Sequence, residues 1–400
     1  MSGVEYWIWL SRTLGEGAKI DDIIGYFGSP SRLYEAGKRE WILSGLLTSK
    51  QIYALSKYSP SESANIINLC RTNGWQMITP DDELYPRNLR NICNFPSVLY
   101  VWGNVEVLLN EVMISIVGTR KASNYGTRVT GLLSSALSKA GATIVSGGAL
   151  GIDSMAHMGA LNAGGKTIAV LGCGLGTDYL RDNAALRKEI SKDGAVISEY
   201  PPFTAASRIT FPMRNRIISG ISLGTVVIEA GEKSGSLITA RLALEQGRDV
   251  FAVPGDIISS AYTGANKLIK DGAKPVFTAS DVLEEYSFMF PNKIDLSKAS
   301  EPLGQALREM QTENPIINTP NIKKIVEKPS AVIQNINREL PKDISENAKK
   351  VYNSIENSSS HIDEISEKTG LKTADCLSAL TELELFSLVS LCEGKKYKKV

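Results

Sequence analysis

Two stretches in the middle of the chain decide its fold: residues 113–120 read MISIVGTR, and residues 143–153 read TIVSGGALGID. Each opens with a short apolar run, turns at glycine, and leads into a segment long enough for an amphipathic helix. An apolar run followed by glycine and then by a helix is typical of a strand in a parallel sheet. We therefore predict strands at 113–117 and 143–146.

The same alternation continues along the chain. Further apolar runs occupy residues 167–171, 195–198, 224–229 and 249–253. Helical patterns lie between the strands, at residues 125–140, 153–163, 183–193 and 235–247. Strands that are apolar on both faces belong to a sheet that is covered on both sides. We predict an α/β fold with a Rossmann-like, doubly wound and mostly parallel sheet, to which strand-like pieces within 75–109 add edge structure.

The flanking regions predict three further parts. Residues 1–70 carry apolar side chains at helical spacing and predict a small helical domain, similar to SAM or helix-hairpin domains. The extended Rossmann-like core then spans 71–286. Residues 287–343 are polar and contain scattered prolines, so we interpret them as a partly disordered linker. Residues 344–400 regain helical spacing and end in a β-ribbon pattern, which predicts a winged-helix-like domain.

Composition restricts the function more than it defines it. The 400 residues carry a formal net charge of +1, so a polyanion would have to be bound by locally gathered positive charge. The chain contains no apolar run long enough to span a bilayer and no signal-peptide pattern at its start. Five widely spaced cysteines argue against a disulfide framework and for a reducing compartment, so we expect a cytoplasmic protein. The two remote histidines disfavour a metal site, and we expect no cofactor.

Several turns after the predicted strands combine glycine with hydroxyl or cationic side chains. Arg120 follows the first strand at the carboxyl edge, where α/β folds bind ligands, although a solvated loop arginine is an equally good interpretation. Glycines and a serine hydroxyl after the second strand could cradle a phosphate, and so could the small residues at the start of a later helix. These cradle residues are Ser146, Gly147, Gly148, Ser234, Gly235 and Ser236. The alternative is simple helix capping.

The densest cationic signal is the stretch RITFPMRNR at residues 208–216. Its three arginines could neutralise successive phosphates, while Phe211 offers a face for a base. The alternative is a solvated helix face with one buried aromatic side chain. Arg181, after a glycine-rich turn, provides a second cation at the same edge. We interpret Asp153 as a helix cap and His157 as a structural histidine.

Taken in order, these motifs resemble the DprA/Smf family of bacterial DNA-processing proteins. The resemblance is strong over about 110–280 and weak in the flanks. It is carried by Gly118-Thr119-Arg120, Ser146-Gly147-Gly148, Gly151-Ile152-Asp153, His157, Gly159-Ala160-Leu161, Phe211-Pro212, Arg214-Asn215-Arg216, Ser234 to Ala240, Val253-Pro254-Gly255 and Gly272-Ala273. One departure is Tyr179-Leu180-Arg181, where the family usually has Tyr-Pro.

The resemblance implies a non-catalytic protein that binds and protects single-stranded DNA and helps to load the recombinase RecA in natural transformation or recombination. It implies that Arg120 and Arg208 hold phosphates, that Phe211 stacks on a base, and that Arg181 extends the basic track. The other residues implied at the DNA site are Ser146, Gly147, Gly148, Arg214, Asn215, Ser234, Gly235 and Ser236. It also implies a homodimer whose pairing surface, shared with RecA, includes Asn266, Ile269, Lys270 and Val276.

Two rival functions remain open at this point. The first is a nucleotide-processing enzyme similar to the lysine-decarboxylase-like phosphoribohydrolases, for which Glu229 is the only plausible carboxylate. Residues 229–235 do not match the motif of those enzymes. The second is a transcription regulator that reads duplex DNA with the module at 344–400.

Overall fold

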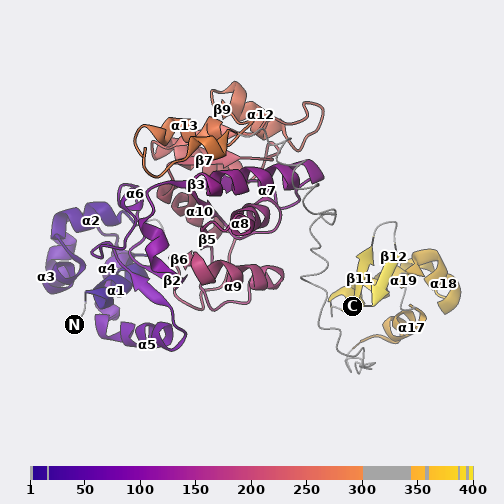
Figure 1. Cartoon of the computed structure of the whole chain (residues 1–400). Coiled ribbons are helices and arrows are strands. Elements are labelled where there is room, and N and C mark those ends of the chain that lie inside the picture. The colour runs from indigo at the N-terminus through magenta and orange to yellow at the C-terminus, as the bar shows by residue number, and fades with distance from the viewer. Residues whose placement is uncertain are drawn as a thin grey trace. The chain divides into compact units, whose positions relative to one another are not determined.

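The computed structural model describes residues 3–15, 18–300, 344–355, 360–385, 388–392 and 396–399. The chain divides into two compact units, Met1–Val326 and Glu327–Val400. Figure 1 shows the many helices of the first unit around one sheet, and the smaller second unit by itself. No helix in the described part of the chain combines the length and the apolarity that crossing a bilayer requires.

The first unit is built on a nine-stranded sheet with the order β1-β2-β6-β5-β4-β3-β7-β8-β9. The strands from β6 to β9 run parallel, while β1 and β2 continue the edge in antiparallel pairing. The strands are β1 Gln76–Ile78, β2 Leu99–Gly103, β3 Met113–Val117, β4 Thr143–Ser146, β5 Thr167–Leu171, β6 Ala195–Ser198, β7 Gly224–Val227, β8 Asp249–Ala252 and β9 Lys274–Pro275. The predicted α/β class and the predicted parallel strands are confirmed.

Successive residues of the central strands enter two different cores. In β3, Ile114 and Ile116 pack with α7 and α8, whereas Met113 and Val117 pack with α10 and α11. This alternation follows from the two-residue period of a strand, and it explains why the buried strands read as continuous apolar runs. The helices of this region are α6 Arg87–Arg90, α7 Asn124–Lys139, α8 Ile152–Asn162, α9 Ala184–Asp193, α10 Thr210–Ile221, α11 Ser236–Glu245, α12 Thr263–Lys270, α13 Ser280–Ser287 and α14 Leu296–Ala299, with short 3-10 turns η2 Val105–Leu109 and η3 Arg181–Asn183.

The N-terminal helices pack against the antiparallel edge of the sheet. Their core contains buried Trp7, Trp9 and Leu33 together with Tyr100 of β2 and Val98 just before that strand. The first unit therefore extends from these helices into the sheet without a break. A separate domain at 1–70 stays a prediction. The elements are α1 Val4–Leu14, α2 Ile20–Phe27, α3 Pro30–Leu43, α4 Ser49–Lys57, η1 Pro60–Ser63 and α5 Ala64–Thr72.

The predicted linker begins inside the folded unit. Ile294 and Ala299 are buried in the core beside α7, and the Asp295 amide donates a hydrogen bond to the Ala140 carbonyl at 3.0 Å. Residues 288–300 are thus part of the fold, although their polar composition predicted a linker. The remainder of that prediction, residues 301–343, lies outside the described residues.

The second unit has its own core and confirms the predicted winged-helix class. Its core includes buried Val351, Ile365, Leu380 and Tyr397. The three strands pair in the order β10-β12-β11, with β12 in the middle of the wing. The elements are α17 Glu346–Ser354, β10 Ser360–His361, α18 Ile362–Thr369, α19 Thr373–Leu385, β11 Val389–Cys392 and β12 Lys396–Lys399.

Candidate nucleic-acid interface

A cavity of about 300 Å³ lies where the strand order reverses, between the carboxyl ends of β3 and β7. The chain winds from β3 outward to β6 and then returns to the other side of β3 with β7, so the loops on either side diverge and leave a crevice. We call it the switch-point cavity. Its lining residues are Val117, Gly118, Thr119, Arg120, Ala149, Asp153, Phe211, Pro212, Arg214, Asn215, Ile218, Ser234, Gly235, Ser236, Ile238 and Thr239.

The mouth of this cavity combines a cation with an aromatic ring. The Arg120 guanidinium carbon lies 5.2 Å from the centroid of the half-buried Phe211 ring, and the Arg120 residue is exposed. Phe211 packs so closely over Gly172 that a β-carbon there would lie 2.8 Å from the ring. The Tyr179 ring stands 5.3 Å from Phe211 on another side. The ring is therefore packed on two sides and lies next to a solvent-exposed positive charge.

The opposite wall is the start of α11. The Ser234 and Ser236 hydroxyls lie 2.8 Å apart, and the N-cap residue Gly235 adds no side chain. A ten-residue helix that begins at a cavity directs the positive end of its dipole there. Its first amides already have partners within the turn: the Ser236 amide donates to the Ser234 hydroxyl and the Leu237 amide to the Ser234 carbonyl. The sequence placed these three residues in a phosphate cradle, and the structure places all three at the same cavity as Arg120.

The floor of the cavity is formed by a buried carboxylate and a buried guanidinium, Asp153 and Arg214. Arg214 is 5% exposed and donates from Nη1 to the carbonyls of Gly147, at 2.6 Å, and of Val170. Asp153, 7% exposed, accepts from the Ala149 amide at 3.3 Å. Burial raises the pKa of Asp153 and lowers that of Arg214, and the attraction between the two opposes both shifts. The helix-cap interpretation missed that Asp153 lines the cavity.

The glycine turn after β4 lies behind this floor and does not line the cavity. The Ser146 hydroxyl is buried and donates to the Ile116 carbonyl at 2.6 Å. A β-carbon on Gly147 would lie 2.6 Å from Asp153 Oδ2 and 2.7 Å from Arg214 Nη2. Gly148 has φ +63° and its carbonyl accepts from Asn183 at 2.9 Å. Direct contact of this turn with DNA stays a prediction; its observed contacts support the floor.

The three arginines of 208–216 do not line up, so the interpretation that they neutralise successive phosphates is wrong. Arg208 is exposed just before α10, Arg214 is buried under the switch-point cavity, and Arg216 pairs with Glu199 on another side of the helix. Residues two positions apart on a helix lie about 200° apart, so Arg214 and Arg216 cannot share a face. Their spacing of two positions within a helix was the signal in the sequence that placed Arg214 and Arg216 on different faces.

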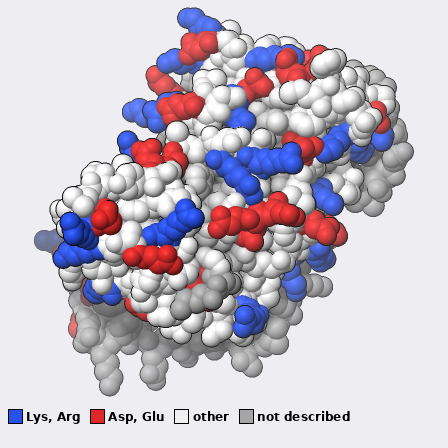
Figure 2. Space-filling model, turned by 90° about the vertical axis from the view of Figure 1, so that its left-hand side faces the viewer, with Lys and Arg blue, Asp and Glu red and all other residues white. Residues whose placement is uncertain are grey.

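Of the two remaining predicted DNA residues, Arg181 lies outside the switch-point cavity and Asn215 lines it. Arg181 is 81% exposed and forms an ion pair of 2.6 Å with Asp178, which offsets its charge locally. Asn215 lines the switch-point cavity, where its Oδ1 accepts from Arg214 Nε at 3.3 Å. On the face shown in Figure 2, basic and acidic side chains are interleaved, in keeping with the small net charge.

Two of the four predicted pairing residues are directed inward. Val276 is 2% exposed within the core, and Asn266 exchanges two hydrogen bonds of 3.1 Å with the backbone of Gly255. The side chain of Val276 therefore offers no surface in the single chain, which corrects its place in the predicted set. Lys270 is exposed and Ile269 is half-buried, so these two remain candidates for a contact surface.

Glu229 and His157 both form hydrogen bonds inside the fold. Glu229 is 1% exposed and accepts hydrogen bonds from the amide and the hydroxyl of Ser123, the N-cap of α7. His157 is fully buried, with Nδ1 2.7 Å from the Thr167 hydroxyl and with Nε2 lacking a hydrogen-bond partner among the described residues, so its interpretation as a structural histidine stays a prediction. Burial lowers the pKa of His157 to about 3. Among the described residues no group of three or more metal-ligating side chains is present.

Comparison with known proteins assigns the family. The DNA recombination-mediator protein A family matches residues 76–287, and the DprA winged helix domain matches residues 338–395. The chain is 44% identical over 215 residues to the DNA processing protein DprA of Bacillus subtilis, which covers 54% of this chain and 72% of the relative. It is 36% identical over 332 residues to Protein Smf of Synechocystis, covering 81% and 80%.

A solved structure agrees with these matches. The X-ray structure of DNA processing protein A from Streptococcus pneumoniae superposes with a TM-score of 0.63 and 34% identity, covering 70% of this chain and 97% of that one. Its coverage of nearly the whole of that chain indicates a shared architecture, and the winged helix match extends the likeness to the second unit. The chain belongs to the DprA/Smf family of DNA-processing proteins.

Proposed function

We propose that this chain is a cytoplasmic, non-catalytic mediator that binds single-stranded DNA of any sequence at the switch-point cavity. The observation that carries the proposal is that Arg120, Phe211 and the start of α11 line one cavity. A cation and the positive end of a helix dipole attract a phosphate, while an aromatic ring attracts a base. The names of its relatives, DNA processing proteins, support the choice of substrate.

The proposed roles follow from these positions. A phosphate is held between Arg120 and the first turn of α11, and the neighbouring base stacks on Phe211. Arg208 and Arg181 meet the strand farther out in solvent, where each contributes weakly. Asp153 and Arg214 keep the floor rigid from below. Because a paired base in a duplex has no free face, stacking on Phe211 selects single strands over double strands.

Two finer elements belong to the same proposal. We propose that the protein pairs as a homodimer and that it helps RecA to assemble on the bound strand in natural transformation or recombination. Family membership supports both, and the exposed side of α12 with Lys270 and Ile269 is the candidate surface. Sedimentation of the Ile269→Lys variant would measure pairing, and RecA filament assembly on single strands coated with that variant would measure loading. If the variant paired and loaded RecA like the wild type, the candidate surface would be contradicted.

Binding of a fluorescent oligo-dT tests the site directly. Arg120→Gln and Phe211→Leu should weaken binding of every sequence alike. Matched controls are Arg128→Gln and Phe288→Leu, since both residues are exposed and neither lines the switch-point cavity. If both cavity variants bound oligo-dT as tightly as their controls, the DNA site would be elsewhere.

A further inference from the structure

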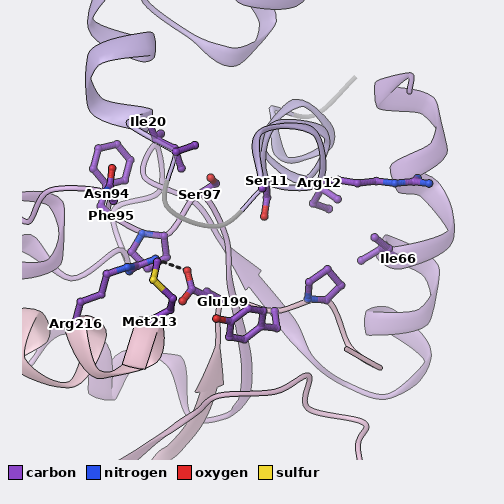
Figure 3. A pocket seen from close by; sticks show the side chains of 16 residues that line it. Ser11, Arg12, Ile20, Ile66, Asn94, Phe95, Ser97, Glu199, Met213 and Arg216 are labelled. Atoms are coloured by element: carbon purple, nitrogen blue, oxygen red, sulfur yellow. Dashed lines mark hydrogen bonds and ion pairs between the residues drawn. The ribbon is translucent and has the colours of Figure 1, made fainter. Parts of the chain in front are cut away.

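A second cavity, of about 330 Å³, lies on another side of α10, between that helix and the N-terminal helices. We call it the α1–α10 cavity. Its walls are apolar side chains from several elements: Ile8, Ile20, Ile66, Phe95 and Met213. Figure 3 shows Ser11 and Ser97 across the cavity from the charged pair Glu199 and Arg216, and Arg12 directed away from that pair. Its volume is in the range of small-molecule sites, about 300–1,000 Å³.

The polar wall of this cavity has unused donors. Arg216 donates from Nη2 to Glu199 Oε2, and the two side chains are 12% and 15% exposed. Nε and Nη1 of Arg216 are buried and have no hydrogen-bond partner among the described residues. A buried donor without a partner costs stability, and an acceptor from outside the chain that reached these two donors through the cavity would remove that cost.

The charges restrict the kind of acceptor. Glu199 already neutralises Arg216, so an anionic ligand would lie beside a carboxylate in a poorly solvated site. A neutral carbonyl oxygen accepts the same N–H groups without that repulsion. The apolar walls, with Phe95 and Met213 among them, favour a flat ring with apolar faces.

We propose that the α1–α10 cavity is a second ligand site, which takes a nucleobase through its ring carbonyl. A nucleobase is neutral and flat and carries carbonyl acceptors on its edge, as thymine does with two of them. The base can come from a free nucleoside or from a strand that crosses α10 from the switch-point cavity. Only the second source rests on the proposed function.

The helix α10 links the two sites. Phe211, Arg214 and Asn215 line the switch-point cavity, while Met213 and Arg216 line the second one. A ligand that contacts Arg216 therefore contacts the same twelve-residue helix that carries Phe211, the proposed base-stacking ring. Occupancy of either cavity should change the affinity of the other by the same factor.

Titration calorimetry with thymidine tests the proposal in the Phe211→Leu protein, where the first stacking position is removed. Ser11→Phe fills the second cavity from the α1 side and leaves Arg216 and the switch-point cavity untouched, whereas the matched variant Ser11→Ala keeps it open. We expect saturable binding in the Phe211→Leu protein and in its Ser11→Ala derivative, and at least a tenfold loss with Ser11→Phe. Arg216→Met should lose binding to the same extent, and deoxyribose should not bind.

The outcomes separate the possibilities. Equal thymidine affinity of the Ser11→Phe and Ser11→Ala proteins, or no saturable binding in any of them, would overturn the proposal and leave water as the occupant. A cooperative thermal transition in each variant verifies that it folds. Competition of bound thymidine by saturating oligo-dT in the Phe211→Leu protein identifies the strand as the source, and its absence identifies free nucleosides; both support the site. Failure of the proposed function would appear separately, as oligo-dT binding that is insensitive to Arg120 and Phe211.

Discussion

The salt dependence of DNA binding distinguishes the two roles at the mouth of the switch-point cavity. Arg120 is exposed and its guanidinium carbon lies 5.2 Å from the centroid of the half-buried Phe211 ring, so one side chain offers charge and the other offers surface. Removing one phosphate contact with a single strand lowers the slope of log affinity against log salt by about 0.7. Arg120→Gln should therefore lose affinity chiefly at low salt.

The expected magnitudes follow from these positions. Between about 50 mM and about 200 mM salt, the affinity ratio of wild type to Arg120→Gln should shrink by about 2.6-fold. Phe211→Leu keeps an apolar side chain over Gly172 but removes the stacking face, which costs about 1–3 kcal/mol, or about 5- to 160-fold in affinity, at every salt concentration.

Fluorescence anisotropy of labelled oligo-dT, at four or more salt concentrations, measures both quantities. Arg128→Gln and Phe288→Leu are the matched controls and should follow the wild type. The assignment of roles is refuted if Arg120→Gln gives a line parallel to the wild type, or if Phe211→Leu flattens the slope as strongly as the arginine variant does.

Four further predictions concern the support of the site and the rival functions. Gly147→Ala should lower the free energy of unfolding by about 1–3 kcal/mol, because its β-carbon would overlap Asp153 and Arg214. The control Gly25→Ala, in open space, should not destabilise the protein. Equal melting temperatures of the two variants would show that the floor adapts to the added methyl group. Burial lowers the pKa of His157 from 6.5 to about 3, so below pH 6.5 the unfolded chain binds a proton that the folded chain does not. The free energy of unfolding should therefore fall by up to about 1.4 kcal/mol per pH unit as the pH drops below about 6.5. Urea unfolding of His157→Asn should lack this pH-dependent component. Nucleoside monophosphates should stay intact with the wild type, so that Glu229→Gln has no base release to lose; release that depends on Glu229, seen by chromatography, would restore the enzyme hypothesis. Removal of residues 344–400 should leave the preference for single over double strands unchanged in a competition assay, and loss of that preference would assign DNA reading to the second unit.

Much of the candidate site could be predicted because it lies in chain-local turns. The loops after β3 and β4 and before α11 carry glycine, hydroxyl and arginine residues directly after apolar strands. Parallel strands bring all their carboxyl ends to one edge, so these loops had to meet there. The position of the cavity between β3 and β7 required the strand order as well, because strand order depends on how the helices pack and not on any one segment.

The errors have a common cause. Arg214 and Arg216 look alike in the sequence, yet one supports the floor through Gly147 and the other pairs with Glu199 on another side of α10. Asp153 was interpreted as a cap because its neighbours in the chain suggest one, while its role at the cavity depends on Arg214, which lies 61 residues away. Val276 was placed at a pairing surface, yet its side chain is buried in the core of the single chain.

The sequence alone determined the fold class, the strand and helix segments of the core, and the loops from which a binding edge is built. It could do so because hydrophobic periodicity and turn chemistry are local properties of the chain. Only the tertiary structure decided which arginine meets solvent, which supports a floor, and which faces a second cavity. The exposure and the partners of a charged side chain depend on residues distant in sequence, and these are brought together only when the chain packs.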